Sequence, residues 1–438
     1  MRQAPLWAHD MAKYMRSGML YWFLLAWLVA SPAAAQDYAF PITNRFAATI
    51  LGSPPELQAE LPADIPASIG QVTVFPDRKV PAVLWLGNRL SYRYSLQEGP
   101  APLVFIIAGT GANHQASKME LMQKILYQAG YHVVGLASPT HPNFLVTASS
   151  RGVPGLLAED AADLYRVMQL VRRQLAGKAA ITGYALTGYS LGGANAAFVA
   201  HLDETERVFN FSKVLMINPP RNLVDTVTRL DRMLEANIPG GLENLDQFLD
   251  KLFIQISEVY QRGDFVDLNN QFLYAAYQHG QVSDDAMLEA IIGADFRFSC
   301  INMTFSADVL TQAGYTVPKG RKLSRGDSLT SYYKVLSRLP FAAYIDGLLL
   351  PALQAREPGL THAELVARVD LRSIEDYLRS SPKLGLMHNV DDIILGPGDI
   401  DWFRSVFGTR AVIYPSGGHC GNLDYRDNVA EIIRFFHE

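Results

Sequence analysis

One serine in this sequence lies in a turn pattern suited to nucleophilic chemistry. Residues 188–192 read Gly-Tyr-Ser-Leu-Gly, which places Ser190 in the spacing G-x-S-x-G, and Gly193 extends it. A strand-like segment precedes the pattern and a helical segment of small residues follows it. The pattern therefore predicts a sharp, strained turn that raises the serine hydroxyl above the end of the strand. Such a hydroxyl can attack an acyl carbon when a neighbouring base removes its proton.

A histidine near the C-terminus is the expected base. His419 lies in the glycine-rich stretch Gly-Gly-His-Cys-Gly, which follows the apolar segment 411–414. Of the other late histidines, His388 falls within a strand pattern and His437 is the penultimate residue. Active-site groups in open α/β sheets lie at the carboxyl ends of strands, so His419 is predicted to activate Ser190.

An acid should lie between the serine and the histidine in the chain, where it would orient the imidazole. Two neighbouring carboxylates, Asp391 and Asp392, follow the apolar segment 384–388. The order of the residues does not decide between them.

With these residues in place, the sequence resembles the α/β-hydrolase family over roughly 71–220 and 383–438. The acid of that family usually lies in the pattern G-x-x-D-x-I-V-P. When Ile394 takes the isoleucine position, the resemblance assigns the acid to Asp392, with Asp391 as the alternative. Asn389 stands in place of the usual glycine and Gly396 in place of the usual proline.

The resemblance also implies an oxyanion hole built from backbone N–H groups. One donor is expected from Leu191, the residue after the serine, and the other from the loop after the strand 103–107. The family usually has His-Gly-x in that loop, whereas this chain has Ala108-Gly109-Thr110. The second donor therefore falls on Thr110, and the missing histidine leaves this role intact because the donor is main chain.

The elements around these residues predict a doubly wound, mostly parallel α/β sheet with a large helical insertion. We expect an irregular N-terminal extension over 36–70, a core over 71–220 and 383–438, and a helical cap over 221–382. The insertion must leave the sheet at the carboxyl ends of its strands, so it should cover Ser190. The expected strands are 71–75, 82–86, 90–94, 103–107, 131–136, 184–187, 214–218, 384–388 and 411–414, and the expected helices include 118–129, 158–175, 191–201 and an apolar face over 245–260.

Composition excludes several classes of protein. The chain has 438 residues with 38 basic and 43 acidic side chains, a net charge of −5 and two cysteines. It is too apolar for a disordered protein, lacks the basic excess of a nucleic-acid-binding protein, and cannot form a four-cysteine zinc site. We find no motif for a cofactor or metal. A disulfide between Cys300 and Cys420 would be compatible with export, and the spacing alone does not decide it.

The first 35 residues have the pattern of a secretory leader. Two basic residues, Lys13 and Arg16, precede an apolar run of 12 residues, 19–30, and Ala33-Ala34-Ala35 forms an A-x-A cleavage pattern. The run is short for a transmembrane helix, which needs about 20 residues, although an uncleaved N-terminal anchor is the alternative. The pattern predicts a periplasmic or secreted protein without a lipid anchor.

Together these features predict an exported serine hydrolase that cleaves a carboxylic ester through a Ser-His-Asp triad and an acyl-enzyme. The apolar cap favours a hydrophobic acyl group, a small-molecule or lipid-like ester substrate, and peripheral membrane contact through the cap. Two alternatives remain at this point. One is a peptidase or amidase with the same triad, and the other is a non-catalytic envelope protein that binds ligands on the same scaffold.

Export gives a first testable prediction. The exported protein should begin near Gln36, because signal peptidase cleaves after small residues in the pattern A-x-A. Intact-mass measurement or N-terminal sequencing of the protein recovered outside the cytoplasm checks this. A membrane-bound species that keeps Met1 would contradict cleavage.

Overall fold

The computed structural model describes residues 38–251 and 284–438. The predicted leader, 1–35, and the second half of the apolar face over 245–260 lie outside the described residues. The chain divides into two compact units, Met1–Ala39 and Phe40–Glu438. All the helices and strands of the described residues belong to the second unit.

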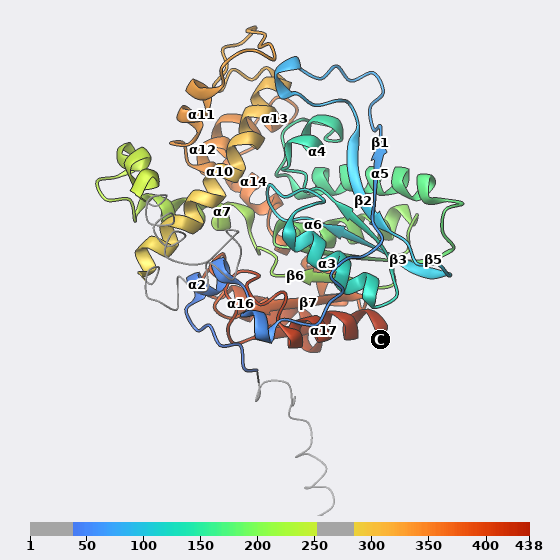
Figure 1. Ribbon diagram of the computed structural model, residues 1–438. Coiled ribbons are helices and arrows are strands. Elements are labelled where there is room, and N and C mark those ends of the chain that lie inside the picture. Colours follow the sequence, from blue (N-terminus) through green and yellow to red (C-terminus); the bar gives the residue numbers. More distant parts are fainter. Residues whose placement is uncertain (1–37, 252–283) are drawn as a thin grey trace, which may run out of the picture. The chain divides into compact units, whose positions relative to one another are not determined.

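A single eight-stranded sheet forms the centre of this unit (Figure 1). The strand order is β1-β2-β4-β3-β5-β6-β7-β8; β2 pairs antiparallel with both β1 and β4, and the other pairs are parallel. The predicted doubly wound, mostly parallel sheet is thus confirmed. The strands are β1 Ser68–Val72, β2 Leu90–Ser95, β3 Ala101–Ile107, β4 His132–Leu136, β5 Ile181–Tyr189, β6 Val214–Ile217, β7 Leu384–Asn389 and β8 Ala411–Tyr414.

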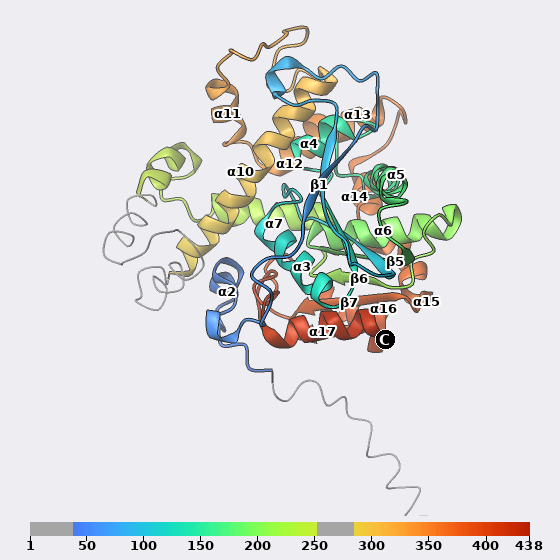
Figure 2. The same ribbon diagram turned by 45° about the vertical axis from the view of Figure 1, so that its right-hand side comes forward.

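Helices cover both faces of the sheet, which explains the continuous apolar runs of its central strands. On one face, α5 (Leu157–Leu175) and α6 (Leu191–Glu206) pack together over the odd-numbered residues of β3 in one hydrophobic cluster. On the other face, α3 (Ser117–Gln128) lies beside α17 (Arg426–His437), as Figure 2 shows. Both faces of β3 are buried, and its residues 103–107 have no exposed surface.

The predicted irregular extension over 36–70 is wrong in part. The chain forms a helix, α2 (Arg45–Leu51), before a short 3-10 turn and the start of β1. Asn44 begins α2, because its side-chain oxygen accepts hydrogen bonds from the N–H groups of Phe46 and Ala47 at 3.0 Å each. The helix then buries Phe46, Ala47 and Leu51, and this burial fixes it to the folded unit.

Two predicted edge strands also need correction. The first strand runs from Ser68 to Val72 rather than over 71–75. The apolar stretch 82–86 forms a 3-10 turn, Ala82–Leu84, in place of a strand. Pro81 precedes this turn, and Trp85 ends it in the left-handed region at φ 53°. A short apolar run does not by its periodicity distinguish a strand from one helical turn.

The insertion between β6 and β7 is helical, as expected, and its long helix α10 (Asp285–Thr311) crosses α7 (Leu223–Glu235). The two helices approach so closely that a Cβ atom on Gly293 would lie 2.5 Å from the backbone nitrogen of Leu234. The other elements of the insertion within the described residues are a 3-10 turn Leu242–Asn244, α11 Thr330–Leu336, α12 Phe341–Tyr344, a π-helical stretch Ile345–Leu349, α13 Leu350–Gln354, α14 His362–Arg368, a 3-10 turn Leu371–Ile374 and α15 Glu375–Ser380.

The end of the insertion belongs to the core. Leu371, Ile374 and Leu378 pack in the same hydrophobic cluster as the sheet, α5 and α6. The boundary predicted at residue 382 is therefore too late. Among the described residues no single helix has the length and apolar composition needed to cross a membrane; α11 with the stretch Phe341–Gln354 meets that test only as a pair bent by 107°.

Candidate active site

Ser190 occupies the sharp turn between β5 and α6. Its φ and ψ angles are 54° and −129°, and its N–H donates to the Ile217 carbonyl oxygen of β6 at 2.8 Å. The turn depends on glycine at both flanking positions, because a Cβ atom on Gly188 would lie 2.2 Å from the Gly192 oxygen and one on Gly192 would lie 2.1 Å from the Ile107 oxygen. Positive φ at a non-glycine residue costs about 1–3 kcal/mol and is typical of functional turns.

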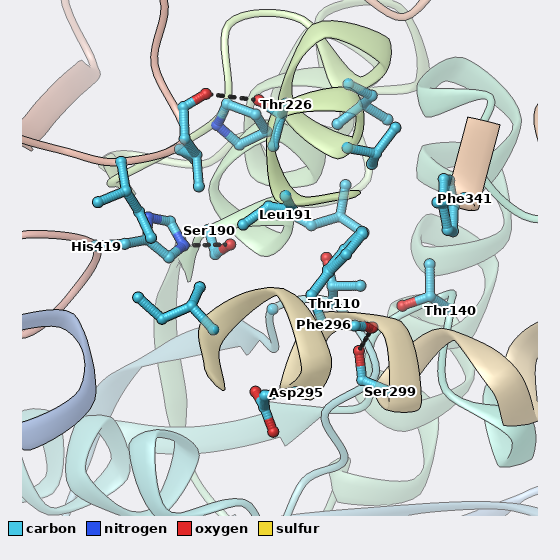
Figure 3. A pocket seen from close by; sticks show the side chains of 18 of the residues that line it. Thr110, Thr140, Ser190, Leu191, Thr226, Asp295, Phe296, Ser299, Phe341 and His419 are labelled. Carbon is cyan, nitrogen blue, oxygen red and sulfur yellow. Dashed lines mark hydrogen bonds between the residues drawn. The ribbon is translucent and has the colours of Figure 1, made fainter. Parts of the chain in front are cut away.

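The structure brings together the three residues that the sequence singled out. The Nε2 atom of His419 lies 2.9 Å from the Ser190 hydroxyl oxygen, as Figure 3 shows. The Nδ1 atom of the same ring lies 3.1 and 3.0 Å from the two carboxylate oxygens of Asp392. The three side chains follow the carboxyl ends of β5, β7 and β8, and the two ring nitrogens of His419 join the hydroxyl to the carboxylate.

Asp392 is held as an ionised carboxylate. Burial alone would raise the pKa of Asp392, but the charge and hydrogen bond of His419 outweigh that effect and the pKa lies below its ordinary value. The carboxylate also accepts hydrogen bonds from the Asn218 side chain at 2.8 Å and the Ile394 N–H at 3.1 Å. Burial lowers the pKa of the adjacent His388, so that imidazole is neutral. The sequence alone did not identify Asn218 as a hydrogen-bond partner of Asp392.

Asp391 has a different task. Its two carboxylate oxygens accept hydrogen bonds from the Gly417 N–H at 3.2 Å and the Gly418 N–H at 3.0 Å, two residues that precede His419. Asp391 thus fixes the backbone of the histidine loop and does not contact the imidazole. Between the two carboxylates that the sequence left open, the geometry favours Asp392 as the partner of His419.

Asn389, which stands where the family usually has glycine, also stabilises the histidine loop. Its side-chain nitrogen donates to the Gly418 carbonyl oxygen at 2.8 Å and to the side chain of Asn422 at 2.9 Å. This departure from the family pattern therefore adds another tie between the end of β7 and the histidine loop.

Helix α2 supports the histidine loop from the other side. The N–H of His419 donates to the Thr49 hydroxyl at 2.8 Å. A Cβ atom on Gly418 would lie 2.4 Å from the Arg45 oxygen, and one on Gly421 would lie 1.9 Å from the Ala48 oxygen. Sequence reasoning missed this contact because it treated the segment as irregular, although Asn44 is a typical N-cap residue.

The two expected backbone donors lie beside the serine. Leu191 and Thr110 line the same cavity as Ser190 and His419 (Figure 3). Leu191 is the first residue of α6, where N–H groups have no partner within the helix. In the described part of the chain, neither N–H donates a hydrogen bond to another protein group. Both remain free to bind an oxygen atom in the cavity, and their role stays a prediction.

A cavity of about 490 Å³ opens next to Ser190. The insertion supplies most of the apolar wall of this cavity. Two ionisable side chains, Asp295 of α10 and Lys118 of α3, also line it. Burial raises the pKa of Asp295, while the charge of Lys118 opposes that shift. Apolar side chains that line the cavity include Leu223, Val224, Val227, Leu230, Ile292, Phe296, Phe341, Ile345, Leu349, Leu365 and Val369.

The two cysteines do not pair. Cys300 and Cys420 are both free and buried, so the disulfide considered from the sequence is not present. Burial raises the pKa of each thiol to about 12. Both thiols are therefore protonated at neutral pH and are poor nucleophiles. Among the described residues, no group of three or more His, Cys, Asp or Glu side chains could hold a metal ion.

No protein-family model matches the sequence, and no curated protein matches it either. Among solved structures, the chain is similar to an esterase of Pyrococcus furiosus at 11% identity and a TM-score of 0.41, over 86% of this chain and 98% of that one. It is similar to the esterase Est1E from Butyrivibrio proteoclasticus at 12% identity and a TM-score of 0.38, over 84% and 100% of the two chains. It is also similar to a bacterial membrane phospholipase A at 15% identity and a TM-score of 0.39, over 85% and 86%.

The topology of the chain itself defines its fold. The sheet is parallel except for β2, which is antiparallel to both of its neighbours, β1 and β4. Strand β5 leads through a strained G-x-S-x-G turn into α6, and helices cover both faces of the sheet. This arrangement is the α/β-hydrolase fold.

The contact between α2 and the histidine loop gives a second prediction. Thr49→Val removes the acceptor of the His419 N–H at nearly constant volume, and an unpaired buried N–H costs about 1–3 kcal/mol. We expect the labelling of Ser190 by a fluorophosphonate probe to slow about tenfold, with near-normal labelling in Thr49→Ser.

The matched control is Thr228→Val. The Thr228 hydroxyl donates to the carbonyl oxygen four residues earlier on α7, as the Thr49 hydroxyl does on α2, both at 2.7 Å, but Thr228 does not contact the histidine loop. If folded Thr49→Val protein labels at the wild-type rate, Thr49 does not position His419.

Proposed function

We propose that this protein is an exported serine hydrolase that cleaves carboxylic esters with a hydrophobic acyl group. One observation carries the proposal. The hydroxyl of Ser190 is hydrogen-bonded to His419 and, through it, to the ionised Asp392, at the wall of a largely apolar cavity. The export part of the proposal rests on the leader pattern alone.

The geometry supports a two-step acyl transfer. With a proton on Nδ1 facing Asp392, the Nε2 atom of His419 accepts the Ser190 proton as the hydroxyl oxygen attacks the ester carbon. The negative oxygen that develops would be bound by the N–H groups of Leu191 and Thr110. His419 then gives its proton to the departing alcohol, which leaves the acyl group on Ser190. Water attacks that acyl-enzyme with His419 again as base.

Asp392 has two tasks in this scheme. Its carboxylate accepts the Nδ1–H of His419 and so fixes the tautomer with a free lone pair on Nε2. Its depressed pKa keeps it negative while the imidazole gains a proton. The Asn218 side chain, which also binds this carboxylate, holds it in place for that purpose.

The cavity supports the choice of acyl group. Its wall is mostly aliphatic and aromatic. Its volume of about 490 Å³ lies in the range of sites that bind small molecules. A hydrophobic chain on the acyl side would displace water from this wall and gain about 0.8 kcal/mol per buried CH₂ group. Peptidase or amidase activity requires the same groups around Ser190 and remains the second candidate. Parallel turnover on ester, thioester and peptide panels separates the two.

The triad gives a third prediction. Ser190→Ala and His419→Ala should each lower ester turnover by roughly 10⁴- to 10⁶-fold, because the members act as a unit. Asp392→Asn should cost about 10⁴-fold by imposing the wrong tautomer. Asp391→Asn should cost far less, since that side chain contacts only the loop backbone. Steady-state kinetics and fluorophosphonate labelling check these values.

Thermal melting controls for unfolding in each variant. Activity retained in Ser190→Ala would refute the proposal, and a larger loss in Asp391→Asn than in Asp392→Asn would move the triad acid to Asp391. A protein with no labelling at all would be the non-catalytic binding protein instead.

The cavity wall gives a fourth prediction. Leu349 lines the cavity, whereas its neighbour Leu350 does not. Leu349→Gln places an amide against the acyl chain. A mismatch of this size in an apolar pocket weakens binding of the transition state by about 1–3 kcal/mol. We expect kcat/KM for long-chain esters to fall at least tenfold relative to acetyl esters, with an unchanged rate of labelling by a small fluorophosphonate.

Leu350→Gln is the control, and it should leave the chain-length profile as in the wild type. An identical, flat profile in the wild type and both variants would show that the cavity does not bind the acyl group.

A further inference from the structure

One loop of the insertion carries a concentration of positive charge that the proposed activity does not use. Within residues 318–326 lie Lys319, Arg321, Lys322 and Arg325, in a chain whose net charge is −5. Asp327 follows directly and its carboxylate accepts the Ser324 N–H at 2.8 Å, so residues 318–327 together carry a net charge of +3. All four side chains are exposed. None of the four forms an ion pair within the described residues. We call residues 318–326 the basic loop.

The basic loop is fixed to the insertion. At its start, the carboxylate of Asp308 on α10 accepts the N–H groups of Tyr315, Thr316 and Val317 at 2.9, 2.7 and 2.8 Å. Val317 and Leu323 are buried in a hydrophobic cluster with α10 and the turn that contains Val83. The loop therefore holds its apolar side chains inward and its four cations outward on a rigid support.

An exposed tryptophan stands beside these cations. Trp85 has 67% of its surface exposed and adopts a left-handed backbone at φ 53°. It follows directly on Val83 and Leu84, which pack in the same cluster as the loop. The guanidinium of Arg325 lies 5.1 Å from the centre of the indole ring. A large apolar ring is thus exposed to water, on a strained backbone, in contact with Arg325 of the basic loop.

We propose that this surface, formed by the basic loop and Trp85, docks on an anionic lipid bilayer. Lysine and arginine near a negative membrane surface contribute about 1 kcal/mol each. Tryptophan is the side chain that prefers the headgroup level of a bilayer. Because the chain as a whole has a net charge of −5, this local excess of cations favours the orientation in which the basic loop faces the anionic bilayer.

The docked surface is mechanically linked to the cavity wall. Tyr315, at the base of the loop, packs so closely on Gly347 that a Cβ atom there would lie 2.3 Å from its ring. Gly347 belongs to the π-helical stretch Ile345–Leu349, and both ends of that stretch line the cavity. Docking would therefore place the wall of the cavity near a bilayer. The docking itself does not depend on the proposed activity.

The test uses protein without residues 1–35, because the leader contains its own apolar run and Trp7, Trp22 and Trp27, while Phe40–Glu438 form one compact unit. Sedimentation with vesicles should show binding to phosphatidylcholine mixed with phosphatidylglycerol, little binding to phosphatidylcholine alone, and weakening by salt. Substitution of the four cations of the basic loop by glutamine should weaken binding several hundredfold, at about fivefold per cation.

The control removes the same charge elsewhere, by substituting glutamine for the exposed Arg173, Lys178, Arg207 and Arg404, and should bind as the wild type does. The protein without its leader has two tryptophans, Trp85 and Trp402, and the second is half-buried and donates to Glu375 at 2.8 Å. Anionic vesicles should shift indole emission to shorter wavelength in Trp402→Phe but not in Trp85→Phe.

Equal binding to both kinds of vesicle, equal losses in the loop variant and its control, or a shift that persists in Trp85→Phe would each overturn the proposal. Binding to a DNA oligonucleotide without binding to vesicles would assign the surface to a different polyanion and overturn it as well.

Discussion

The hydrogen bond between the Ser190 hydroxyl and Nε2 of His419 is the interaction on which the rest of the site depends. It joins two residues 229 positions apart in the sequence, and it forms because β5 and β8 run parallel and end at the same edge of one sheet. The strained turn at Ser190 brings the hydroxyl to that edge. Two glycines whose Cβ atoms would meet backbone oxygen atoms at about 2 Å permit the turn.

His419, the second partner of that hydrogen bond, lies in a loop. A loop needs contacts from other segments to keep one conformation. Four such contacts are present here. Asp391 binds the backbone of Gly417 and Gly418, Asn389 binds the Gly418 oxygen, Thr49 binds the His419 N–H, and Asp392 binds the ring. These contacts come from β7, from the segment after it and from α2, so distant parts of the chain fix one imidazole. Preorganisation of this kind lets a triad act without reorganising during the reaction.

Much of the fold and the central residues of the site could be predicted from the sequence, for physical reasons. Strands buried on both faces appear as continuous apolar runs, so β3, β6 and β7 were predicted to within about two residues. The edge strand β8 is only partly buried, and its run of four apolar residues was enough to predict its bounds. Ser190 was singled out because its turn demands glycine on both sides, and His419 because chain order and strand ends restrict the position of the expected base. The structure brings the two side chains together, and their catalytic roles stay predictions. The residues alone did not separate Asp391 from Asp392, because both follow β7 and only the three-dimensional contacts distinguish them.

What the sequence did not reveal depends on contacts between distant segments. Helix α2 is short, and it packs on the histidine loop and on α10, both distant in the sequence. The prolines around it therefore suggested an irregular segment. The buried partner Asn218 has no local pattern that marks it. The turn at Ala82–Leu84 was predicted as a strand. An apolar run this short has no periodicity that would distinguish a helical turn from a strand. The surface that joins Trp85 to residues 318–326 exists only after folding.

The central claim is that His419 activates Ser190 to form a covalent acyl-enzyme. The most direct test is to mix the protein with an excess of an activated ester, quench with acid and locate the added mass by peptide mapping. The account predicts one acyl group on the peptide that contains Ser190, and no such adduct in His419→Ala protein. Turnover of the ester without an adduct, or an adduct on Cys420, would contradict it.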